Sequence, residues 1–291
     1  MAAVDQNRLP DFLAVGPPRT ATTWLERMLA GRVGLPAGIK ETAFFTKNYD
    51  LGLPWYAAHF QTCPSEFPVG EICPVYFDSS EARGRIAQHI PDVRVIITLR
   101  DPVQRLYSHY RLLRREGWIG ALTLDQALAK DLKWSGAGNL HGSNRYATHV
   151  AEWQRMFGAA RVLVLIHDDL IAAPQTFLDR VCDFVGIARF EITRAQARER
   201  INTVERAPLS PRFARYGRKI REPLIRRQWY RMLDAGRPLW DLCAGGGEYF
   251  PPLLPEVEAR LRAQLRPEVE ALEALLNRDL SPWKEILRSA A

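Results

Sequence analysis

The strongest constraint on the fold is a run of β-branched and other apolar residues at positions 93–99, Val-Arg-Val-Ile-Ile-Thr-Leu. A nearly continuous run of this kind is typical of a strand that is buried on both faces of a parallel sheet. Residues 161–167 form a second such run, and 12–15 and 69–77 are two further strand candidates. Helical patterns separate these strands as far as residue 190. The sequence therefore predicts an α/β fold, a parallel sheet with helices on both faces.

Length and composition limit the possible classes of protein. The 291 residues are 47% hydrophobic, which suffices for a full core and argues against disorder. They predict a single domain over 1–291, in which 201–291 is a mostly helical C-terminal part with a basic loop at 201–217. The net charge of +7 favours anionic ligands. Because no apolar leader or membrane-length segment is visible, we expect a cytoplasmic protein without stable membrane insertion.

Residues 12–29 combine a short strand, a turn and the start of an amphipathic helix. The turn carries Gly16 and Arg19, and Thr22 and Thr23 open the helix. Backbone N–H groups at a helix N-terminus lack intrahelical partners and lie at the positive end of the helix dipole. This stretch therefore predicts an anion-binding loop. A solvent-exposed arginine in an ordinary turn is the alternative.

The loop differs from the ATP-binding pattern G-x-x-x-x-G-K-[ST]. Counted from Gly16, Ala21 takes the second glycine position and Thr22 the lysine position, while the basic residue is Arg19. This arrangement suits a 5′-phosphate that carries one transferable group, held by backbone amides and hydroxyls of residues 20–23. A kinase-like phosphotransferase that uses ATP and magnesium is the alternative function, and the missing Gly-Lys pair disfavours it.

A second anion site is predicted after the strongest strand. Arg100 stands at the carboxyl end of this strand, and Ser108 follows in the next helix. Ligands of open α/β sheets bind outside the carboxyl ends of the strands, and an arginine side chain matches the geometry of a phosphate. Two anion sites together predict a nucleotide with phosphates at both ends. The alternative is an internal ion pair of Arg100 with Asp101 or a neighbour.

These segments resemble the sulfotransferases that use 3′-phosphoadenosine 5′-phosphosulfate (PAPS). The family's 5′-phosphosulfate loop is similar to Leu-Ala-Val-Gly-Pro-Pro-Arg-Thr-Ala-Thr-Thr-Trp-Leu at 13–25. Its 3′-phosphate motif is similar to Ile-Ile-Thr-Leu-Arg-Asp-Pro-Val-Gln-Arg-Leu-Tyr-Ser-His-Tyr at 96–110. Further stretches at 40–45, 71–77 and 144–153 resemble the heparan sulfate sulfotransferase branch, and 277–283 resembles the family's end. The resemblance implies a P-loop-like parallel sheet with additional C-terminal helices, in a bacterial member of the family.

The resemblance also implies roles for individual residues. Binding of PAPS, and of the product adenosine 3′,5′-bisphosphate (PAP), falls to Arg19, Thr20, Ala21, Thr22, Thr23, Trp24, Arg100, Ser108, Tyr146, Arg206 and Arg212. For the last two, a solvated run of charge is an equal alternative. Glu41 is placed near a strand end, at the position of the family's glutamate base. Glu41 and Arg19 are thus the predicted catalytic residues, and an ion pair of Glu41 with Lys40 or Arg19 is the alternative.

Other side chains compete for these roles or limit the choice of acceptor. His59, His109 and His149 are rival bases, although we expect them to pack and to form hydrogen bonds. Against the heparan sulfate branch, Arg19 replaces a lysine, Ala21 a glycine, Ala43 a histidine, Thr46 an aspartate and Ile72 a lysine. The acceptor pocket must therefore differ. A small molecule, lipid, glycan or peptide is possible, through a hydroxyl or an amine.

Three further expectations concern partners and metals. The aromatic residues at 50–60 favour an apolar or ring-bearing acceptor, unless they only pack. No nucleic acid is expected, because the aromatic residues fall mostly at core spacing. The four cysteines lack metal-ligand spacing, so we expect free thiols and no metal. The sequence leaves the oligomeric state open.

Overall fold

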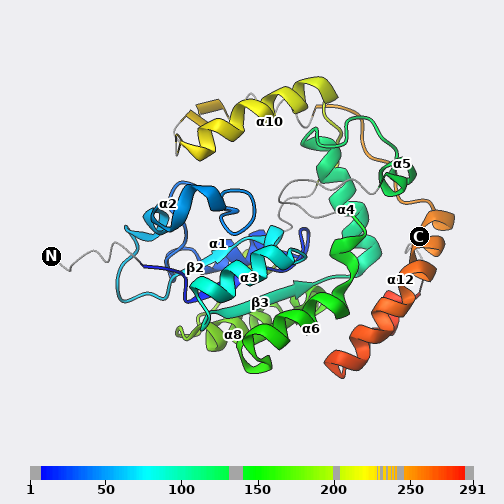
Figure 1. Cartoon of the computed structure of the whole chain (residues 1–291). Coiled ribbons are helices and arrows are strands. Elements are labelled where there is room, and N and C mark those ends of the chain that lie inside the picture. Colours follow the sequence, from blue (N-terminus) through cyan, green and yellow to red (C-terminus); the bar gives the residue numbers. More distant parts are fainter. Residues whose placement is uncertain are drawn as a thin grey trace. The chain divides into compact units, whose positions relative to one another are not determined.

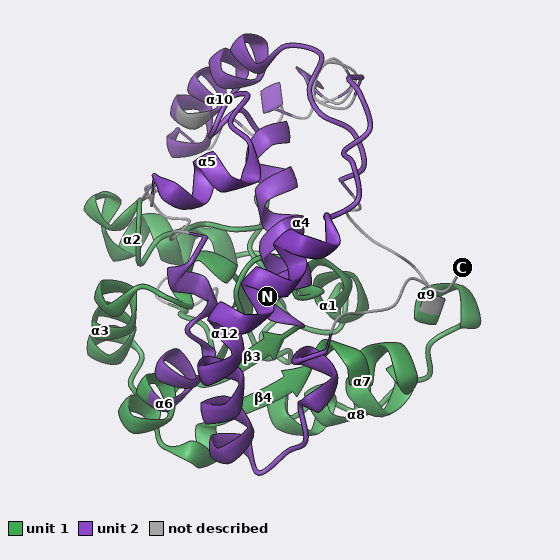
Figure 2. Cartoon of the chain, turned by 90° about the vertical axis from the view of Figure 1, so that its right-hand side faces the viewer, with its two compact units in different colours: residues 1–100, 135–138, 152–203 green, residues 101–134, 139–151, 204–291 purple. Residues whose placement is uncertain are grey.

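The structure, a computed structural model, divides into two compact units (Figure 2). It describes residues 8–130, 140–198, 204–227 and 246–285, together with single positions between 229 and 240. Of these, 8–100 and 152–198 belong to unit 1, and 101–130, 140–151 and the residues from 204 onward belong to unit 2. The single domain over 1–291 stays a prediction.

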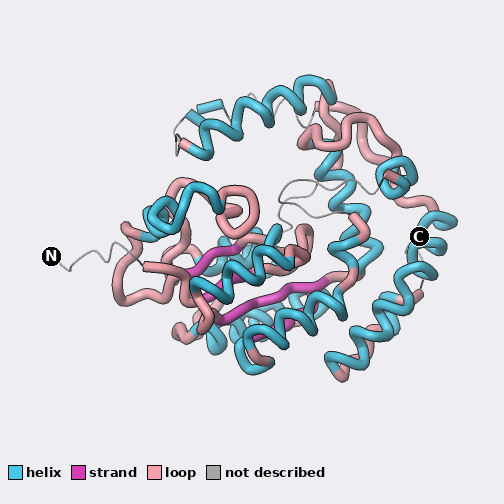
Figure 3. The backbone as a smooth tube through the Cα atoms, in the orientation of Figure 1, coloured by secondary structure: helices cyan, strands magenta, loops and turns pink. Residues whose placement is uncertain are grey.

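Unit 1 is built on a parallel sheet, which Figure 3 shows in magenta. Its strands among the described residues are β1 (Phe12–Ala14), β2 (Gly70–Ile72), β3 (Arg94–Leu99) and β4 (Val162–Ile166), in the order β2-β1-β3-β4. Ala14 is in register with Ile72 on one side and with Ile96 on the other. β3 is buried from Val95 onward, as its β-branched run predicts.

Helices cover both faces of this sheet (Figure 2). On one face, α1 (Thr22–Leu29), α7 (His167–Ala172) and α8 (Pro174–Val185) share a hydrophobic core with the strands. The other face carries α3 (Ser80–His89) and the second half of α6 (Tyr146–Phe157). There Trp153 donates its Nε1–H to the carbonyl oxygen of Phe77 at 3.0 Å. The predicted α/β fold with a covered parallel sheet is confirmed.

Shorter elements complete unit 1, and helices dominate the described part of unit 2 (Figure 1). Unit 1 also contains η1 (Tyr49–Leu51), α2 (Gly52–Ala57), η2 (Ala58–Phe60), η3 (Pro74–Tyr76), η5 (Ala159–Arg161) and α9 (Arg194–Arg198). Unit 2 contains α4 (Pro102–Arg115), α5 (Leu124–Ala129), η4 (Gly142–Asn144), α10 (Pro211–Arg226), α12 (Pro255–Leu276) and η6 (Ser281–Trp283). Its core includes Val103 and Leu106 of α4, packed with Leu261 of α12.

The prediction of a basic loop over 201–217 is wrong in its second half, because α10 begins at Pro211. The hydroxyl of Ser210 accepts the backbone N–H of Phe213 at 3.4 Å and caps the helix. A proline fits the first helical position, where an N–H would have no intrahelical partner. The Ser-Pro pair therefore starts a helix. Residues 201–203 lie outside the described residues.

The turn after β1 packs tightly against β3. A Cβ atom on Gly16 would lie 2.6 Å from the backbone N, the backbone O and the Oγ1 of Thr98. The hydroxyl of Thr20 lies 2.7 Å from the Thr98 hydroxyl and also donates to the carbonyl oxygen of Pro17 at 2.8 Å. This turn therefore requires glycine at position 16, and two hydroxyls attach it to the neighbouring strand.

The first prediction tests this close approach. Gly16→Ala is expected to lower the free energy of unfolding by at least about 2 kcal/mol, because the added methyl group overlaps the backbone of Thr98. Gly84→Ala is the matched control. Gly84 is exposed in α3 and an added Cβ meets nothing within 4 Å, so the change should stabilise the protein by about 0.5–1 kcal/mol. Urea unfolding measures both values, and equal midpoints for Gly16→Ala and the native protein would contradict the prediction.

Candidate functional site

The strand order places a topological switch point between β1 and β3. From β1 the chain continues to β2 at one edge of the sheet, and from β3 it continues to β4 at the other edge. Ligands of open α/β sheets bind at such a point, outside the carboxyl ends of the strands. The turn after β1 and Arg100, directly after β3, both lie at the carboxyl ends of these two neighbouring strands, which is the edge of the sheet meant below.

The turn between β1 and α1 has the backbone of an anion-binding loop. Arg19 and Ala21 have φ angles of 80° and 73°, a left-handed conformation that strains residues other than glycine. Ala21 occupies the N-cap position of α1 and provides no side-chain cap, and the first turn contains no acidic residue. No side chain at these positions therefore offsets the positive end of the α1 dipole, an arrangement that favours an anion.

The side chains of this predicted loop serve different purposes. Thr20 and Thr22 are buried, and the hydroxyl of Thr20 is engaged with Pro17 and Thr98. Trp24 is also buried, and its Nε1–H donates to the carbonyl oxygen of Gln196 at 2.9 Å. The side chains of Thr20 and Trp24 thus support the fold, so that any contact they make with a ligand comes from their backbone. The hydroxyl of Thr23 instead accepts a hydrogen bond from Lys40 at 2.6 Å.

Glu41 lies in an irregular segment, so its predicted place near a strand end is wrong. The backbone reverses at Ala43, whose φ of 49° no strand residue adopts. The segment is held by Thr42, whose N–H and hydroxyl both donate to Oε1 of Glu71 at 2.7 and 2.6 Å. The Thr42 carbonyl oxygen accepts from the side-chain amide of Asn48 at 2.7 Å. Glu41 therefore projects from a backbone that is fixed on its C-terminal side.

Glu71 is the buried centre of this arrangement. It lies on β2 and is fully buried. Its Oε2 accepts hydrogen bonds from the hydroxyls of Tyr56 at 2.8 Å and Tyr76 at 3.0 Å. Burial raises the pKa of Glu71, and the hydrogen bonds from Thr42 and the two tyrosines oppose this rise. No role of Glu71 is predicted from the sequence, although an acidic residue within an apolar strand is a usable signal.

The electrostatic surroundings of Glu41 suit a proton acceptor. Its Oε1 lies 3.5 Å from Nζ of Lys40, and its side chain is 35% exposed. Partial desolvation raises the pKa of Glu41, the charge of Lys40 lowers it, and the carboxylates of Glu26 and Glu71 raise it further. A carboxylate with a raised pKa binds a proton more readily. The ion pair with Lys40 that the sequence suggests as an alternative is also present.

Arg100 and His167 follow two paired strands. Leu99, the last residue of β3, is in register with Ile166, the last residue of β4. Burial, and next the positive charge of Arg100, lower the pKa of His167 to about 4. His167 is therefore neutral at pH 7, and Arg100 supplies the positive charge at this edge. No role of His167 is predicted from the sequence, although it is the last residue of a predicted strand.

The other predicted nucleotide contacts belong to unit 2. Ser108 is buried on α4, and Tyr146 is buried at the start of α6, edge-on to Trp283 at 6.3 Å between ring centroids. Arg206 donates to the hydroxyl of Tyr249 at 2.6 Å. Arg212 is exposed at the second position of α10.

An ion network fixes the start of α4. Asp101 accepts the N–H groups of Val103 at 2.9 Å and Gln104 at 3.0 Å, and so caps the helix. Its other oxygen accepts from the buried Arg262 at 2.9 Å, and Arg262 also binds Glu258. Asp101 of the Arg-Asp-Pro corner is therefore occupied by the helix cap and by α12.

The rival histidines make the hydrogen bonds that the sequence analysis expects of them. His149 Nε2 lies 2.9 Å from the carbonyl oxygen of Gly142, and His59 Nδ1 lies 3.0 Å from that of Trp55. His109 is buried, with its Nδ1 3.4 Å from Nη1 of Arg105.

The aromatic residues at 50–60 pack against one another and against Phe44 and Phe45. Tyr56 and Phe60 are fully buried, and Tyr56 stacks on Phe44 at 4.6 Å between ring centroids. These rings therefore support the packing interpretation. The hydroxyl of Tyr56 points to Glu71 and donates a hydrogen bond to it.

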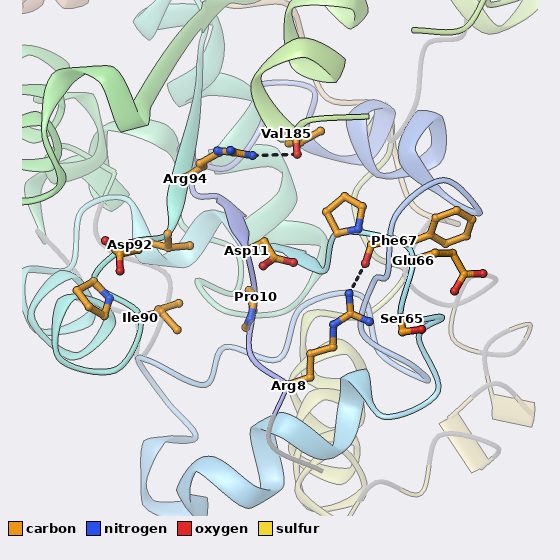
Figure 4. Close-up of a pocket in the computed structure, with 13 residues that line it drawn as sticks. Arg8, Pro10, Asp11, Ser65, Glu66, Phe67, Ile90, Asp92, Arg94 and Val185 are labelled. Atoms are coloured by element: carbon orange, nitrogen blue, oxygen red, sulfur yellow. Dashed lines mark hydrogen bonds between the residues drawn. The ribbon is translucent and has the colours of Figure 1, made fainter. Parts of the chain in front are cut away.

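A pocket of about 540 Å³ lies at the amino ends of the strands, opposite the candidate anion site (Figure 4). Its lining includes Asp11, directly before β1, and Arg94, the first residue of β3. Asp11 accepts the N–H of Val69 at 2.7 Å, and Arg94 donates to the carbonyl oxygen of Val185 at 3.1 Å. These polar groups hold the amino ends of the strands, so this pocket is distinct from the predicted anion site.

Within the described ranges, no group of three or more His, Cys, Asp or Glu side chains is arranged to hold a metal ion. No helix in the described part of the chain is both long and apolar enough to cross a membrane. Cys63, Cys73 and Cys182 are free thiols.

Fold and site together define a parallel α/β protein with its candidate anion site at the switch point. The model of a family described as "Sulfotransferase family" matches residues 74–191. The chain is 27% identical to bifunctional heparan sulfate N-deacetylase/N-sulfotransferase 4 of Mus musculus, over 97% of this chain and 31% of the relative. It is 31% identical to heparan sulfate glucosamine 3-O-sulfotransferase 3B1 of Homo sapiens, over 62% of this chain and 47% of the relative.

The chain thus spans less than half the length of these two curated relatives. The crystal structure of a sulfotransferase from Alicyclobacillus acidocaldarius matches with a TM-score of 0.68 at 20% identity, over 96% of this chain and 100% of that chain, and supports the fold. The chain is thus similar to sulfotransferases in part of its sequence and in its fold, in agreement with the resemblance of its motifs.

The second prediction concerns stability in acid. The pKa of His167 is about 4 in the folded protein, against about 6.5 for an unperturbed histidine. Between these values the unfolded chain binds a proton that the folded protein does not, so stability falls as the pH drops from 7 to 4. Between pH 7 and pH 4, the free energy of unfolding of His167→Gln should therefore decrease by up to about 3 kcal/mol less than that of the native protein.

Urea unfolding at a series of pH values between 4 and 7 measures this effect. His141 is exposed, so His141→Gln is the control and should follow the native curve. A His167→Gln curve with the native slope over this range would contradict the assignment.

Proposed function

We propose that this protein transfers the sulfuryl group of PAPS to a hydroxyl or an amine of an acceptor. The observation that carries the proposal is the turn after β1. It ends on a helix N-terminus without a side-chain cap and lies at the same sheet edge as Arg100. PAPS has a phosphosulfate at its 5′ end and a phosphate at its 3′ end, so two cationic sites at one edge match its two anionic ends.

The residues of this chain suit both ends of such a donor. Backbone N–H groups of residues 20–24 and the guanidinium of Arg19 bind the 5′-phosphosulfate. Arg100 binds the 3′-phosphate through its planar set of donors. The further proposed contacts with the nucleotide are Ser108, Tyr146, Arg206 and Arg212.

The reaction is proposed to be an in-line displacement. A bond forms between the acceptor oxygen or nitrogen and the sulfur, while the bond from sulfur to the bridging oxygen breaks and leaves its electron pair on the phosphate of PAP. Arg19 and the N-terminus of α1 stabilise the charge on that oxygen, and Glu41 takes the proton of the acceptor. Partial desolvation of Glu41 supports this role because it raises the proton affinity of the carboxylate.

A glycan is the first acceptor class to test, because the names of the relatives specify heparan sulfate. Heparan sulfate itself does not follow, since Ala43, Thr46 and Ile72 depart from that branch. Small molecules, lipids and peptides are the alternatives. A screen with PAPS that carries ³⁵S in its sulfuryl group, against amino and hydroxyl compounds of each class, identifies the acceptor by transfer of the label.

The third prediction tests the nucleotide site by calorimetry without magnesium. Arg100→Ala should weaken the binding of PAP about 10- to 100-fold, because a charge-assisted contact is lost. The affinity for 5′-AMP should stay within about twofold of the native value. Arg94→Ala is the matched control, because Arg94 lies at the opposite end of the same strand. Equal losses for PAP and 5′-AMP would remove the 3′-phosphate assignment. If the native protein binds only ATP with magnesium, the proposed function fails.

The fourth prediction tests the base. Glu41→Gln should reduce transfer of ³⁵S to the acceptor found in the screen by about 10²–10⁴-fold, because the amide cannot take the proton. Its affinity for PAP should stay within about twofold of the native value. Glu81→Gln, an exposed carboxylate on α3, is the control for charge. Retained transfer by Glu41→Gln would assign the base elsewhere, with His149 as the next residue to test.

A further inference from the structure

Lys40 links the anion-binding loop of unit 1 to the proposed base. Its Nζ donates to Oγ1 of Thr23 at 2.6 Å. It also lies 3.5 Å from Oε1 of Glu41 and 3.5 Å from Oε2 of Glu26. Because Thr23 is the second residue of α1, the ammonium stands at the N-terminus of this helix and beside Glu41.

Fold stability alone gives little reason for a cation in this place. The positive end of a helix dipole disfavours a cation at the N-terminus. Ion pairs between partly exposed side chains contribute only about 0–1 kcal/mol, and Lys40 is 31% exposed, Glu26 26% and Glu41 35%. The arrangement places an ammonium between two carboxylates, at the end of a helix whose N-cap residue provides no side-chain oxygen.

We propose that Lys40 is a catalytic residue that binds the transferring sulfuryl group. The inference rests on the proposed function. Thr23 belongs to the loop that holds the donor, and Glu41 is the base that faces the acceptor. An ammonium in contact with the first and beside the second lies on the path of the sulfur from donor to acceptor.

The chemistry requires no change in the protonation of Lys40. Its N–H groups bind the non-bridging oxygens of the sulfuryl group and stabilise their negative charge during the displacement. The carboxylates of Glu26 and Glu41 keep the ammonium oriented before the donor binds. Lys40 thus acts on the group in transfer, whereas Arg19 and the helix N-terminus act on the leaving oxygen.

A comparison of PAPS with PAP tests this role, because PAP lacks only the sulfuryl group. In calorimetry without acceptor, Lys40→Met is expected to weaken the binding of PAPS about 10- to 100-fold. Its affinity for PAP should stay within about twofold of the native value. Lys40→Arg should recover part of the loss. Lys130→Met is the control, since Lys130 is exposed at the end of α5. Retained PAP binding also shows that the variant is folded.

Equal losses of PAPS and PAP, or no loss of either, would overturn the inference. With an acceptor, the turnover of Lys40→Met is expected to fall at every pH. Because Lys40 lowers the pKa of Glu41, a lysine that only tunes the base would instead move the acid limb of the pH profile to higher pH with an unchanged plateau, and this result also overturns the proposal. If the native protein binds neither PAPS nor PAP, the proposed function itself fails.

Discussion

The close approach of the turn after β1 to Thr98 of β3 is the contact on which the rest of unit 1 depends. Gly16 permits the approach, and the hydroxyl of Thr20 secures it. Because this turn continues directly into α1, the same contact sets where the helix N-terminus lies at the sheet edge. The left-handed backbone of Arg19 and Ala21 carries the strain of the reversal. Group transfer needs a loop held this firmly, since small displacements of the reacting atoms are costly.

The buried carboxylate of Glu71 is the second constraint. A buried charge destabilises a protein unless hydrogen bonds satisfy it, and Thr42, Tyr56 and Tyr76 provide donors to both of its oxygens. The effect reaches the candidate site through the backbone, because Thr42 adjoins Glu41. The buried carboxylate of Glu71 thus helps to fix the position of the partly exposed Glu41. In unit 2, the buried Arg262 holds the start of α4 in a comparable way, through Asp101.

Local patterns predicted much of this structure. The β-branched run became β3, and the strand candidates at 12–15 and 161–167 became β1 and β4, because strand burial depends on near neighbours in the chain. The errors also have a local cause. The segment around Glu41 is apolar enough for a strand, but the turn at Ala43 and the hydrogen bonds of Thr42 to distant Glu71 give it another backbone. Such bonds leave no periodic signal.

The sequence by itself determined a parallel α/β fold and a resemblance to sulfotransferases, because turn chemistry and hydrophobic period are properties of short stretches; its two phosphate-binding segments stay predictions. Only the tertiary structure decided the order β2-β1-β3-β4, and with it the switch point that brings the turn after β1 and Arg100 to one edge. It also decided that Lys40, 17 residues beyond Thr23, reaches the start of α1. Contacts of this kind arise from the packing of separate segments, which no local pattern specifies.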